Sequence, residues 1–260
     1  MALATSDELL AIFMPVVVYW IYSGMYVIFG WGFENYRLHS RKEEEEKNFV
    51  PKKTVIKAVL LQQTFQSIAL FLMFKVTGGN HDVGASKGQA SSYIVIARQF
   101  VVAMLVMDTL QYFMHRYMHY NKYFYRHFHS YHHRIVVPYV YGAFYNDNVD
   151  RLPDAIGTTL ATFLAGMSPR TSTFFVSLAT IKAVDDHSGM LLPGNPFHIF
   201  FWNNSAFHDT HHQLCGGKYN FSTPFFVMWD RIMGTYMPYS IEKRAEGGFE
   251  VRAIKELKDD

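Results

Sequence analysis

The feature that most constrains the fold is a run of 23 residues, Leu9 to Trp31, that contains no charged side chain. A helix of about 20 apolar residues is long enough to cross the hydrocarbon core of a bilayer. A secretory signal peptide would instead need a basic start, a shorter apolar stretch and a small-residue cleavage site. The sequence has none of these, so this run predicts a membrane helix that is retained in the protein.

Further apolar segments follow the first one. Ala58–Phe74 carries no charge, and Tyr93–Met114 reads as a third spanning helix. Ala155–Met167 and Thr171–Ile181 are each too short to cross alone, and Ser168-Pro169-Arg170 separates them, which favours a hairpin that enters the membrane and returns. Charged residues make up only 18% of the chain, against about 25% in soluble domains. The sequence therefore predicts an all-α integral membrane protein with about four membrane-embedded helices, counting the hairpin.

Positive side chains predict how the chain is oriented. Residues 34–53 contain lysines and arginines around an acidic run, Glu43 to Glu46, and we interpret them as a solvated loop. Positively charged loops beside spans stay on the cytosolic side, so the N-terminus and residues 78–92 are expected in the lumen. The basic, aromatic residues 115–151 and the C-terminus are then cytosolic, and they are expected to form a helical cap. The net charge of +2 and the absence of a long basic tract argue against nucleic acid as a partner.

Nine of the 13 histidines fall into three clusters and one isolated position, all on the predicted cytosolic side. They are His115 and His119; His129, His132 and His133; His187; and His208, His211 and His212. Residues four apart on a helix share a face, so His115 and His119 can hold one metal ion. In each HxxHH cluster we expect the first two histidines to share a face and the third to reach a different metal ion. Eight or nine imidazoles suit two metal ions of intermediate softness.

The identity of the metal follows only in part from the ligands. Imidazole suits zinc, copper, nickel and iron, and the single Cys215 excludes a multi-thiolate site. A structural zinc needs four ligands, so nine histidines beside a membrane favour a redox pair. Four further residues are candidates for contacts behind the ligands: Asp108, which could accept the second N–H of a ligating histidine, Tyr112, Asp209, and Asp230, which could equally cap a helix. The other histidines, His39, His81, His127 and His198, are expected to be surface or hydrogen-bonded residues.

The order HxxxH, HxxHH, HxxHH resembles the fatty acid hydroxylase superfamily of membrane di-iron enzymes. Residues 185–189, 192–197, 203–213, 218–222 and 229–236 look like the sphinganine C4-hydroxylase branch, and most like its plant members. We therefore expect an N-terminal membrane hairpin with a cytosolic loop in residues 1–92 and a fatty acid hydroxylase domain in residues 93–260. One departure is visible: where the family often has His-Pro and then an acidic residue, this chain has Asp147-Asn148-Val149-Asp150.

The resemblance implies a function. Two iron ions would be held by the nine histidines, with no catalytic residue outside the metal ligands. With O2, the enzyme would hydroxylate C4 of sphinganine, either free or within a ceramide, to give phytosphingosine-type bases. Electrons would come from NAD(P)H through a separate cytochrome b5 and its reductase. The location would be the endoplasmic reticulum membrane, with ceramide synthase as a further partner.

Two alternatives stay open at the level of sequence. Another lipid oxidation of the same superfamily, such as sterol C4-methyl oxidation, would use the same ligands and a different lipid pocket. A membrane metal carrier or an inactive metal-binding scaffold belongs to a different class. A carrier should place polar ligands within the spans along a path, whereas these histidines gather at one predicted membrane face, which favours an enzyme.

Overall fold

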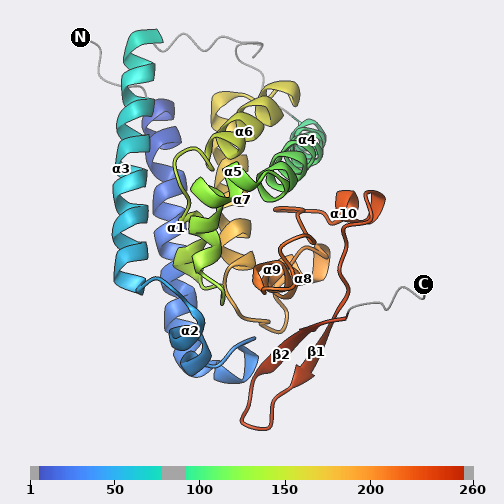
Figure 1. Ribbon diagram of the computed structural model, residues 1–260. Coiled ribbons are helices and arrows are strands. Elements are labelled where there is room, and N and C mark those ends of the chain that lie inside the picture. Colours follow the sequence, from blue (N-terminus) through green and yellow to red (C-terminus); the bar gives the residue numbers. More distant parts are fainter. Residues whose placement is uncertain (1–5, 78–91, 255–260) are drawn as a thin grey trace.

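The computed structural model describes residues 6–77 and 92–254, and these residues are mostly helical (Figure 1). The helices are α1 (Ser6–Gly32), α2 (Arg41–Lys47), α3 (Lys52–Thr77), α4 (Tyr93–Tyr120), α5 (Lys122–His127), α6 (Leu152–Leu164), α7 (Pro169–Asp186), α8 (Pro196–Phe200), α9 (Ser205–His212) and α10 (Met228–Ile232). Three short 3-10 helices are η1 (Glu34–Tyr36), η2 (His129–Arg134) and η3 (Val140–Phe144). Two strands, β1 (Tyr239–Lys243) and β2 (Phe249–Ala253), pair antiparallel.

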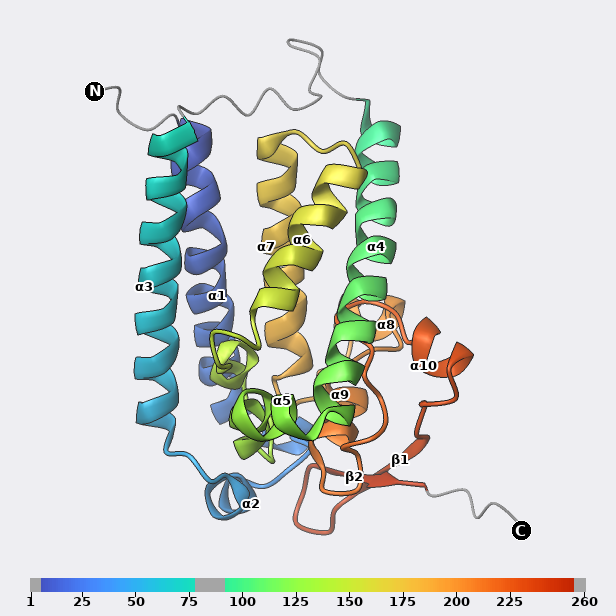
Figure 2. The same ribbon diagram turned by 45° about the horizontal axis from the view of Figure 1, so that its top comes forward.

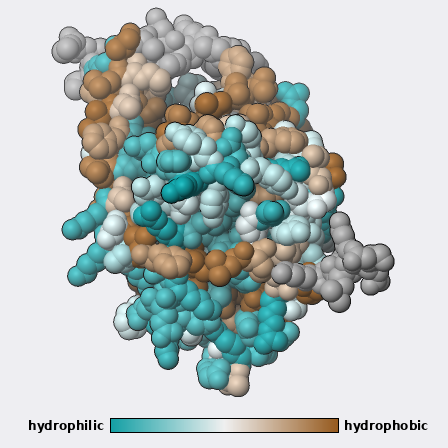
Figure 3. Space-filling model, in the orientation of Figure 1, coloured by the Kyte–Doolittle hydropathy of each residue, from teal (hydrophilic) through white to brown (hydrophobic). Residues whose placement is uncertain are grey.

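Three of these helices are long and apolar enough to cross a membrane. The candidate spans are Asp7–Gly32, Lys52–Val76 and Tyr93–Tyr120, which correspond to α1, α3 and α4. Their outward faces carry large exposed apolar side chains, such as Ile21, Phe65 and Val101. Figure 3 shows hydrophobic residues over the upper helices and mostly hydrophilic residues around α2 and the β-hairpin. The three predicted long helices are therefore confirmed in position, length and composition.

The predicted hairpin corresponds to α6 and α7, which lie beside the three long helices (Figure 2). Ser168 caps the start of α7 by accepting a hydrogen bond from the Thr171 N–H, and Pro169 occupies the first turn, where its missing N–H is tolerated. At 1.5 Å per residue, the 13 residues of α6 and the 18 of α7 rise about 20 and 27 Å. Both are shorter than the roughly 30 Å of the bilayer core. Their insertion into a membrane stays a prediction.

The charged segment 34–53 is not the solvated loop that the sequence suggested. Ser40 and Glu43 form a capping box that starts α2, with each side chain bonded to the backbone N–H of the other. Glu44 is only 3% exposed and forms an ion pair with Arg37. The S-x-x-E pattern of the cap is the local sequence signal for this helix. The acidic run Glu43 to Glu46 that follows it is typical of a solvated segment.

The prediction of an all-α protein is wrong at the C-terminal end, where β1 and β2 form a two-stranded sheet. Gly247 and Gly248 adopt positive φ in the connecting turn, which glycine does without steric cost. Val251 is buried and packs in a small core with Leu38 and Ala206 of the neighbouring segments. The strands are short and half-exposed, so their hydrophobic pattern is weak in the sequence.

Two larger apolar cores hold the helices together. One joins α1 and α3 to the segments around η3 and α7 through Tyr19, Val55, Tyr139 and Val184. The other packs α4 against α6 and α7. The C-terminal ends of α4 and α7 are thereby fixed at the same end of the molecule as η2 and α9 (Figure 2).

Candidate metal centre

The nine histidines predicted as ligands meet at this end of the molecule. They come from four elements: the last turns of α4, which carry His115 and His119; η2, which carries His129, His132 and His133; the C-cap of α7, which is His187; and α9, which carries His208, His211 and His212. Asn204 caps α9 by accepting hydrogen bonds from the first backbone N–H groups. Long-range packing, rather than sequence proximity, brings the four elements together.

The nine side chains separate into two groups. In each group, one ring nitrogen per residue lies within 4.8 Å of those of all the others. Group 1 contains His115, His119, His129, His133 and His211, and group 2 contains His132, His187, His208 and His212. The groups adjoin, since the rings of His133 and His212 stack with centroids 4.7 Å apart. This arrangement offers two neighbouring positions for metal ions.

The expected pairing within the HxxHH clusters is wrong. The first and third histidines share a group, and the second belongs to the other one: His208 and His212 lie in group 2 with His211 in group 1, and His129 and His133 lie in group 1 with His132 in group 2. On the α-helix α9, a residue four positions on is rotated by about 40°, whereas a residue three positions on is rotated by about 60° in the opposite direction. η2 is a 3-10 helix, to which these angles do not apply, and its pairing is set by how it packs against α4 and α9. Each cluster therefore contributes to both groups.

The outer nitrogens of five histidines contact oxygen acceptors. The Nδ1 atoms of His115, His132, His211 and His212 lie 2.7–3.3 Å from the backbone carbonyl oxygens of Phe221, Tyr145, Tyr219 and Ile135, respectively. The Nδ1 of His129 lies 2.8 Å from the Asp150 carboxylate. Because a carbonyl or ionised carboxylate oxygen only accepts, these Nδ1 atoms carry the protons. The Nε2 lone pairs are then free for a metal ion, the arrangement that outer hydrogen bonds produce in metal sites.

The inner nitrogens fit metal ions better than they fit one another. In group 1 the Nε2 of His119 lies 2.8 Å from that of His129 and 3.1 Å from that of His133. In group 2 the Nε2 atoms of His208 and His187 are 2.7 Å apart. Lone pairs facing each other at such distances repel unless a proton or a cation lies between them. An all-nitrogen donor set of this kind suits a first-row transition metal.

Burial keeps the imidazoles of His132, His133 and His208 neutral. It lowers the pKa of His132 to about 4, with a further contribution from His129. It also lowers the pKa of His133 and His208 well below the usual value, together with the neighbouring imidazoles. Metal ligands must be unprotonated, so the site is ready to bind cations at neutral pH.

Of the four candidates for supporting contacts, Asp108 and Tyr112 do not contact a histidine through a hydrogen bond among the described residues. The Asp108 carboxylate accepts hydrogen bonds from the backbone N–H groups of Phe225 and Phe226. The Tyr112 hydroxyl lies 2.8 Å from the Thr235 Oγ1. Both side chains hold the segment 221–235 against α4, because a buried polar group needs a partner and the backbone supplies it.

Asp209 and Asp230 also form their hydrogen bonds with groups other than the nine clustered histidines. Asp209 contacts the Nε2 of His39 at 2.8 Å, so this histidine is hydrogen-bonded as expected. Asp230 accepts hydrogen bonds from the backbone N–H groups of Phe221 and Ser222. The carbonyl of Phe221 contacts His115, so Asp230 fixes the backbone that orients this histidine.

The carboxylate that does contact a histidine of the clusters, Asp150, was absent from the predicted set. It is 7% exposed and lies within 3.0 Å of the His129 Nδ1 through both oxygens. Burial alone would raise its pKa, but the hydrogen bond that it accepts from His129 opposes burial, and the pKa is lowered. In the sequence, Asp150 is the acidic residue that ends the stretch 147–150, where this chain departs from the pattern of the family.

The remaining histidines lie outside both groups. The His127 Nδ1 is 2.9 Å from the Tyr123 carbonyl oxygen, as expected for a hydrogen-bonded residue. The His198 Nε2 lies 3.0 Å from the Asp185 carboxylate, an ion-pair distance. His81 lies outside the described residues.

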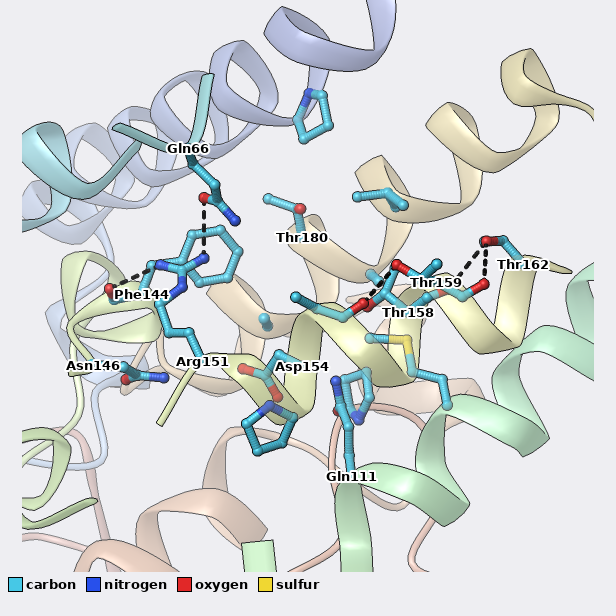
Figure 4. A pocket seen from close by; sticks show the side chains of 18 of the residues that line it. Gln66, Gln111, Phe144, Asn146, Arg151, Asp154, Thr158, Thr159, Thr162 and Thr180 are labelled. Atoms are coloured by element: carbon cyan, nitrogen blue, oxygen red, sulfur yellow. Dashed lines mark hydrogen bonds between the residues drawn. The ribbon is translucent and has the colours of Figure 1, made fainter. Parts of the chain in front are cut away.

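A cavity of about 890 Å³ opens onto the histidines. It is lined by residues of α1, α3, α4, α6 and α7 and reaches His115 and His129 of group 1 and His132, His187 and His208 of group 2. Figure 4 shows its polar side chains, which come mainly from the segment 144–162 and from α3 and α4. The volume is typical of a small-molecule pocket, so an organic substrate can reach both metal positions.

Comparison with known proteins adds independent findings. The family model described as "Fatty acid hydroxylase" matches residues 100–235. "Sphinganine C4-monooxygenase 1" of Arabidopsis thaliana is 62% identical over 261 residues, which cover 100% of this chain and 99% of the relative. "Sphinganine C4-monooxygenase 2" of the same plant is 60% identical over 100% of both chains. "Very-long-chain aldehyde decarbonylase GL1-9" of Oryza sativa subsp. indica is 50% identical over 96% of this chain and 97% of the relative. No solved structure matches significantly.

Proposed function

Since the chain belongs to the fatty acid hydroxylase family, we propose that it is a monooxygenase that hydroxylates C4 of sphinganine or of the same unit in a ceramide. The products are phytosphingosine-type trihydroxy long-chain bases. The observation that carries this assignment is the similarity to the two plant C4-monooxygenases, which extends over the full length. The matched region spans the histidine clusters and the residues that line the cavity.

The metal that we propose is a pair of iron ions, one in each histidine group. When bound, iron supplies the O2-dependent oxidation of an unactivated C–H bond, which protein side chains cannot perform alone. The chain's own residues hold and shield this centre. Asp150 orients His129, and the ring centroid of Tyr125 lies 5.3 Å from that of His119 and 6.0 Å from that of His133. Excluding water from the centre protects an oxidising site from side reactions.

We further propose the setting in which the enzyme works. Residues 1–92 form a membrane hairpin with a cytosolic loop, and residues 93–260 form the hydroxylase domain. The protein lies in the endoplasmic reticulum membrane, with its N-terminus in the lumen and the histidines in the cytosol. Electrons come from NAD(P)H through cytochrome b5 and its reductase, and ceramide synthase is a further partner. The positive charges of residues 34–53, at the same end as the histidines, support this orientation.

One observation favours a second candidate function. The rice relative is named for the decarbonylation of very-long-chain aldehydes and matches nearly the whole chain. An aldehyde reaction could use the same histidines, as could the oxidation of a sterol methyl group. The lipid products therefore have to be identified chemically as well as quantified.

The test is analysis of long-chain bases by mass spectrometry in a host that makes no trihydroxy bases. The chain is expressed beside a His132→Ala variant and a His127→Ala control, whose histidine lies outside both groups. We expect phytosphingosine with the unchanged chain and the control, and none with His132→Ala. If the unchanged chain is stably expressed and makes none, the C4 assignment fails. Hydrocarbons formed from long-chain aldehydes, or oxidised sterols, would then support the alternatives, and no lipid product would support an inactive scaffold.

A further inference from the structure

Among the described residues that line the cavity, the charged side chains lie at its metal end, whereas apolar and hydroxyl side chains line its far end. Gln111, Asn146 and Asp154 line it near the histidines, whereas Ile12 and Phe163 line its other end. Asp154 and Phe163 are nine residues apart on α6, which corresponds to about 14 Å along the helix axis. A lipid with one polar end therefore fits with that end beside the metal centre and its chain directed along the helices.

Asp154 is the acidic side chain of this polar end that has no partner. No hydrogen bond or ion pair joins its carboxylate to another residue in the part of the chain that the structure describes. The charge of the nearby Arg151 favours the ionised form of Asp154. The Arg151 guanidinium, however, makes its hydrogen bonds elsewhere, to the Phe144 carbonyl oxygen at 3.4 Å and to the Gln66 Oε1 at 3.5 Å (Figure 4). The Arg151 guanidinium also lies over the Phe144 ring, 4.9 Å from its centroid.

Two neighbours place Asp154 close to the histidines. Asp150, one helical turn before it, is bonded to His129 of group 1. Asn146 also lines the cavity, and its Oδ1 is buried without a hydrogen-bond partner among the described residues. The cavity thus presents a carboxylate and a free amide oxygen, both acceptors, next to the metal positions. A buried acceptor without a partner, such as the Asn146 Oδ1, is uncommon in native proteins and needs an explanation.

A cationic ligand provides that explanation. A carboxylate in a largely apolar cavity is unfavourable unless a positive charge pairs with it. Neutral imidazoles leave the charge of bound metal ions uncompensated, so a substrate ammonium can approach them only beside a negative group. In sphinganine the amino group is on C2, two carbons from C4, so the group that binds it must lie at the metal end. An N-acylated base carries a neutral amide and an aldehyde carries no nitrogen, and neither would pair with the carboxylate.

We infer that Asp154 binds the ammonium group of the substrate, with Asn146 accepting a hydrogen bond from the same headgroup, and that the preferred substrate is the free long-chain base. This inference rests on the proposed C4 hydroxylation and names which form of the substrate the site accepts. Asp154 acts in binding: it holds C4 toward the histidines, and no bond to it is made or broken.

The test compares Asp154→Asn with the unchanged enzyme on sphinganine and on N-acetylsphinganine. Asp147→Asn is the matched control, because the Asp147 carboxylate accepts a hydrogen bond from the Val149 N–H of its own turn and does not line the cavity. We expect Asp154→Asn to raise KM for sphinganine about 10- to 100-fold, the range for a lost hydrogen bond to a charged group, with a smaller change in kcat. The constants for N-acetylsphinganine should change little. Equal constants for both substrates in the variant and the unchanged enzyme would overturn the inference.

A binding assay separates this inference from the proposed function. Displacement of a fluorescent long-chain base by sphinganine needs no turnover, so it reports on Asp154 even if the product is not a C4 alcohol. Displacement by sphinganine that is weakened in Asp154→Asn, but not in Asp147→Asn, supports the ammonium site. Metal content is measured in parallel. If Asp154→Asn loses metal, the variant Asp154→Glu is used to distinguish the loss of the ammonium site from the loss of the metal centre. Recovery of sphinganine binding by this charge-preserving variant supports the inference, and failure to recover it while metal is retained contradicts it.

Discussion

Asp150 shows how one carboxylate can stabilise a group of otherwise neutral side chains. Both of its oxygens lie within 3.0 Å of the His129 Nδ1, and its lowered pKa keeps it ionised. An ionised acceptor behind the ring makes the inner nitrogen a stronger ligand and fixes its orientation. His129 in turn contacts His119 and His133, so the orientation of one ring affects three.

Replacing Asp150 by alanine should weaken metal binding. We expect a 10- to 100-fold loss of affinity, the usual effect of removing a hydrogen-bond partner behind a ligand. Asp150→Asn should lose less, because an amide oxygen still accepts the Nδ1–H. The measurement is metal content of the purified protein after dialysis against a graded series of chelator concentrations, with Asp147→Ala as the control. Equal retention by Asp150→Ala and Asp147→Ala would show that the contact does not support the metal.

At this scale the sequence predicted which histidines gather and not what surrounds them. Spacings of three and four residues are local, so they could be interpreted without a fold. The contact of Asp150 with His129 spans 21 positions, and that of Asp209 with His39 spans 170. Such contacts depend on how the elements pack. The pairing within the clusters was wrong for a related reason, because it depends on the rotation of η2 and α9 about their own axes.

The turn after α7 joins the metal centre to the N-terminal helices. Gly189, two residues beyond His187, has φ +64°, and its carbonyl oxygen accepts a hydrogen bond from the Leu38 N–H. A Cβ at this position would lie 2.7 Å from the Pro138 carbonyl oxygen. The element therefore needs glycine for its conformation and for the close approach of a second backbone.

Gly189→Ala should destabilise the protein more than Gly194→Ala does. Both residues have positive φ, which costs an alanine about 1 kcal/mol, but a Cβ at Gly194 meets nothing within 4 Å. The difference between the two variants isolates the clash with Pro138 from the backbone strain. The measurement is the thermal midpoint of the detergent-solubilised protein, together with its metal content. Equal thermal midpoints would mean that the segment around Pro138 moves to accommodate the Cβ without a loss of stability.

Elements were predicted well where their signal is strong and local. The long helices α1, α3 and α4 follow from uncharged runs of bilayer length, and the division between α6 and α7 follows from Ser168 and Pro169. The β-hairpin was missed because it depends on tertiary contacts, whereas α2 was missed although its capping box is a local signal. Glu44 is buried by its ion pair with Arg37, and Val251 by the core it forms with Ala206. A polar or short segment gives little hydrophobic periodicity, so its structure is hard to infer from sequence alone.

In the whole molecule, the apolar surfaces and the metal centre are segregated along the helix axes. The large exposed apolar side chains belong mainly to the long helices, whereas α2, η2, α9 and the β-hairpin gather at the end that carries the histidines (Figure 2). The cavity connects the two regions, since α1 and α3 line it together with the histidines. A membrane lipid could thus reach the metal centre without passing through water.

This segregation leads to a prediction about orientation. Lysines and arginines concentrate in residues 34–53, at the histidine end, so that end should face the cytosol and the segment 78–91 the lumen. A glycosylation acceptor inserted at His81 should be modified in microsomes, whereas the same acceptor inserted between Gly247 and Gly248, in the turn of the β-hairpin, should not. Both insertions must leave hydroxylation intact for the comparison to count. Modification at the hairpin and none at His81 would reverse the topology, and it would place the metal centre out of reach of a cytosolic electron donor.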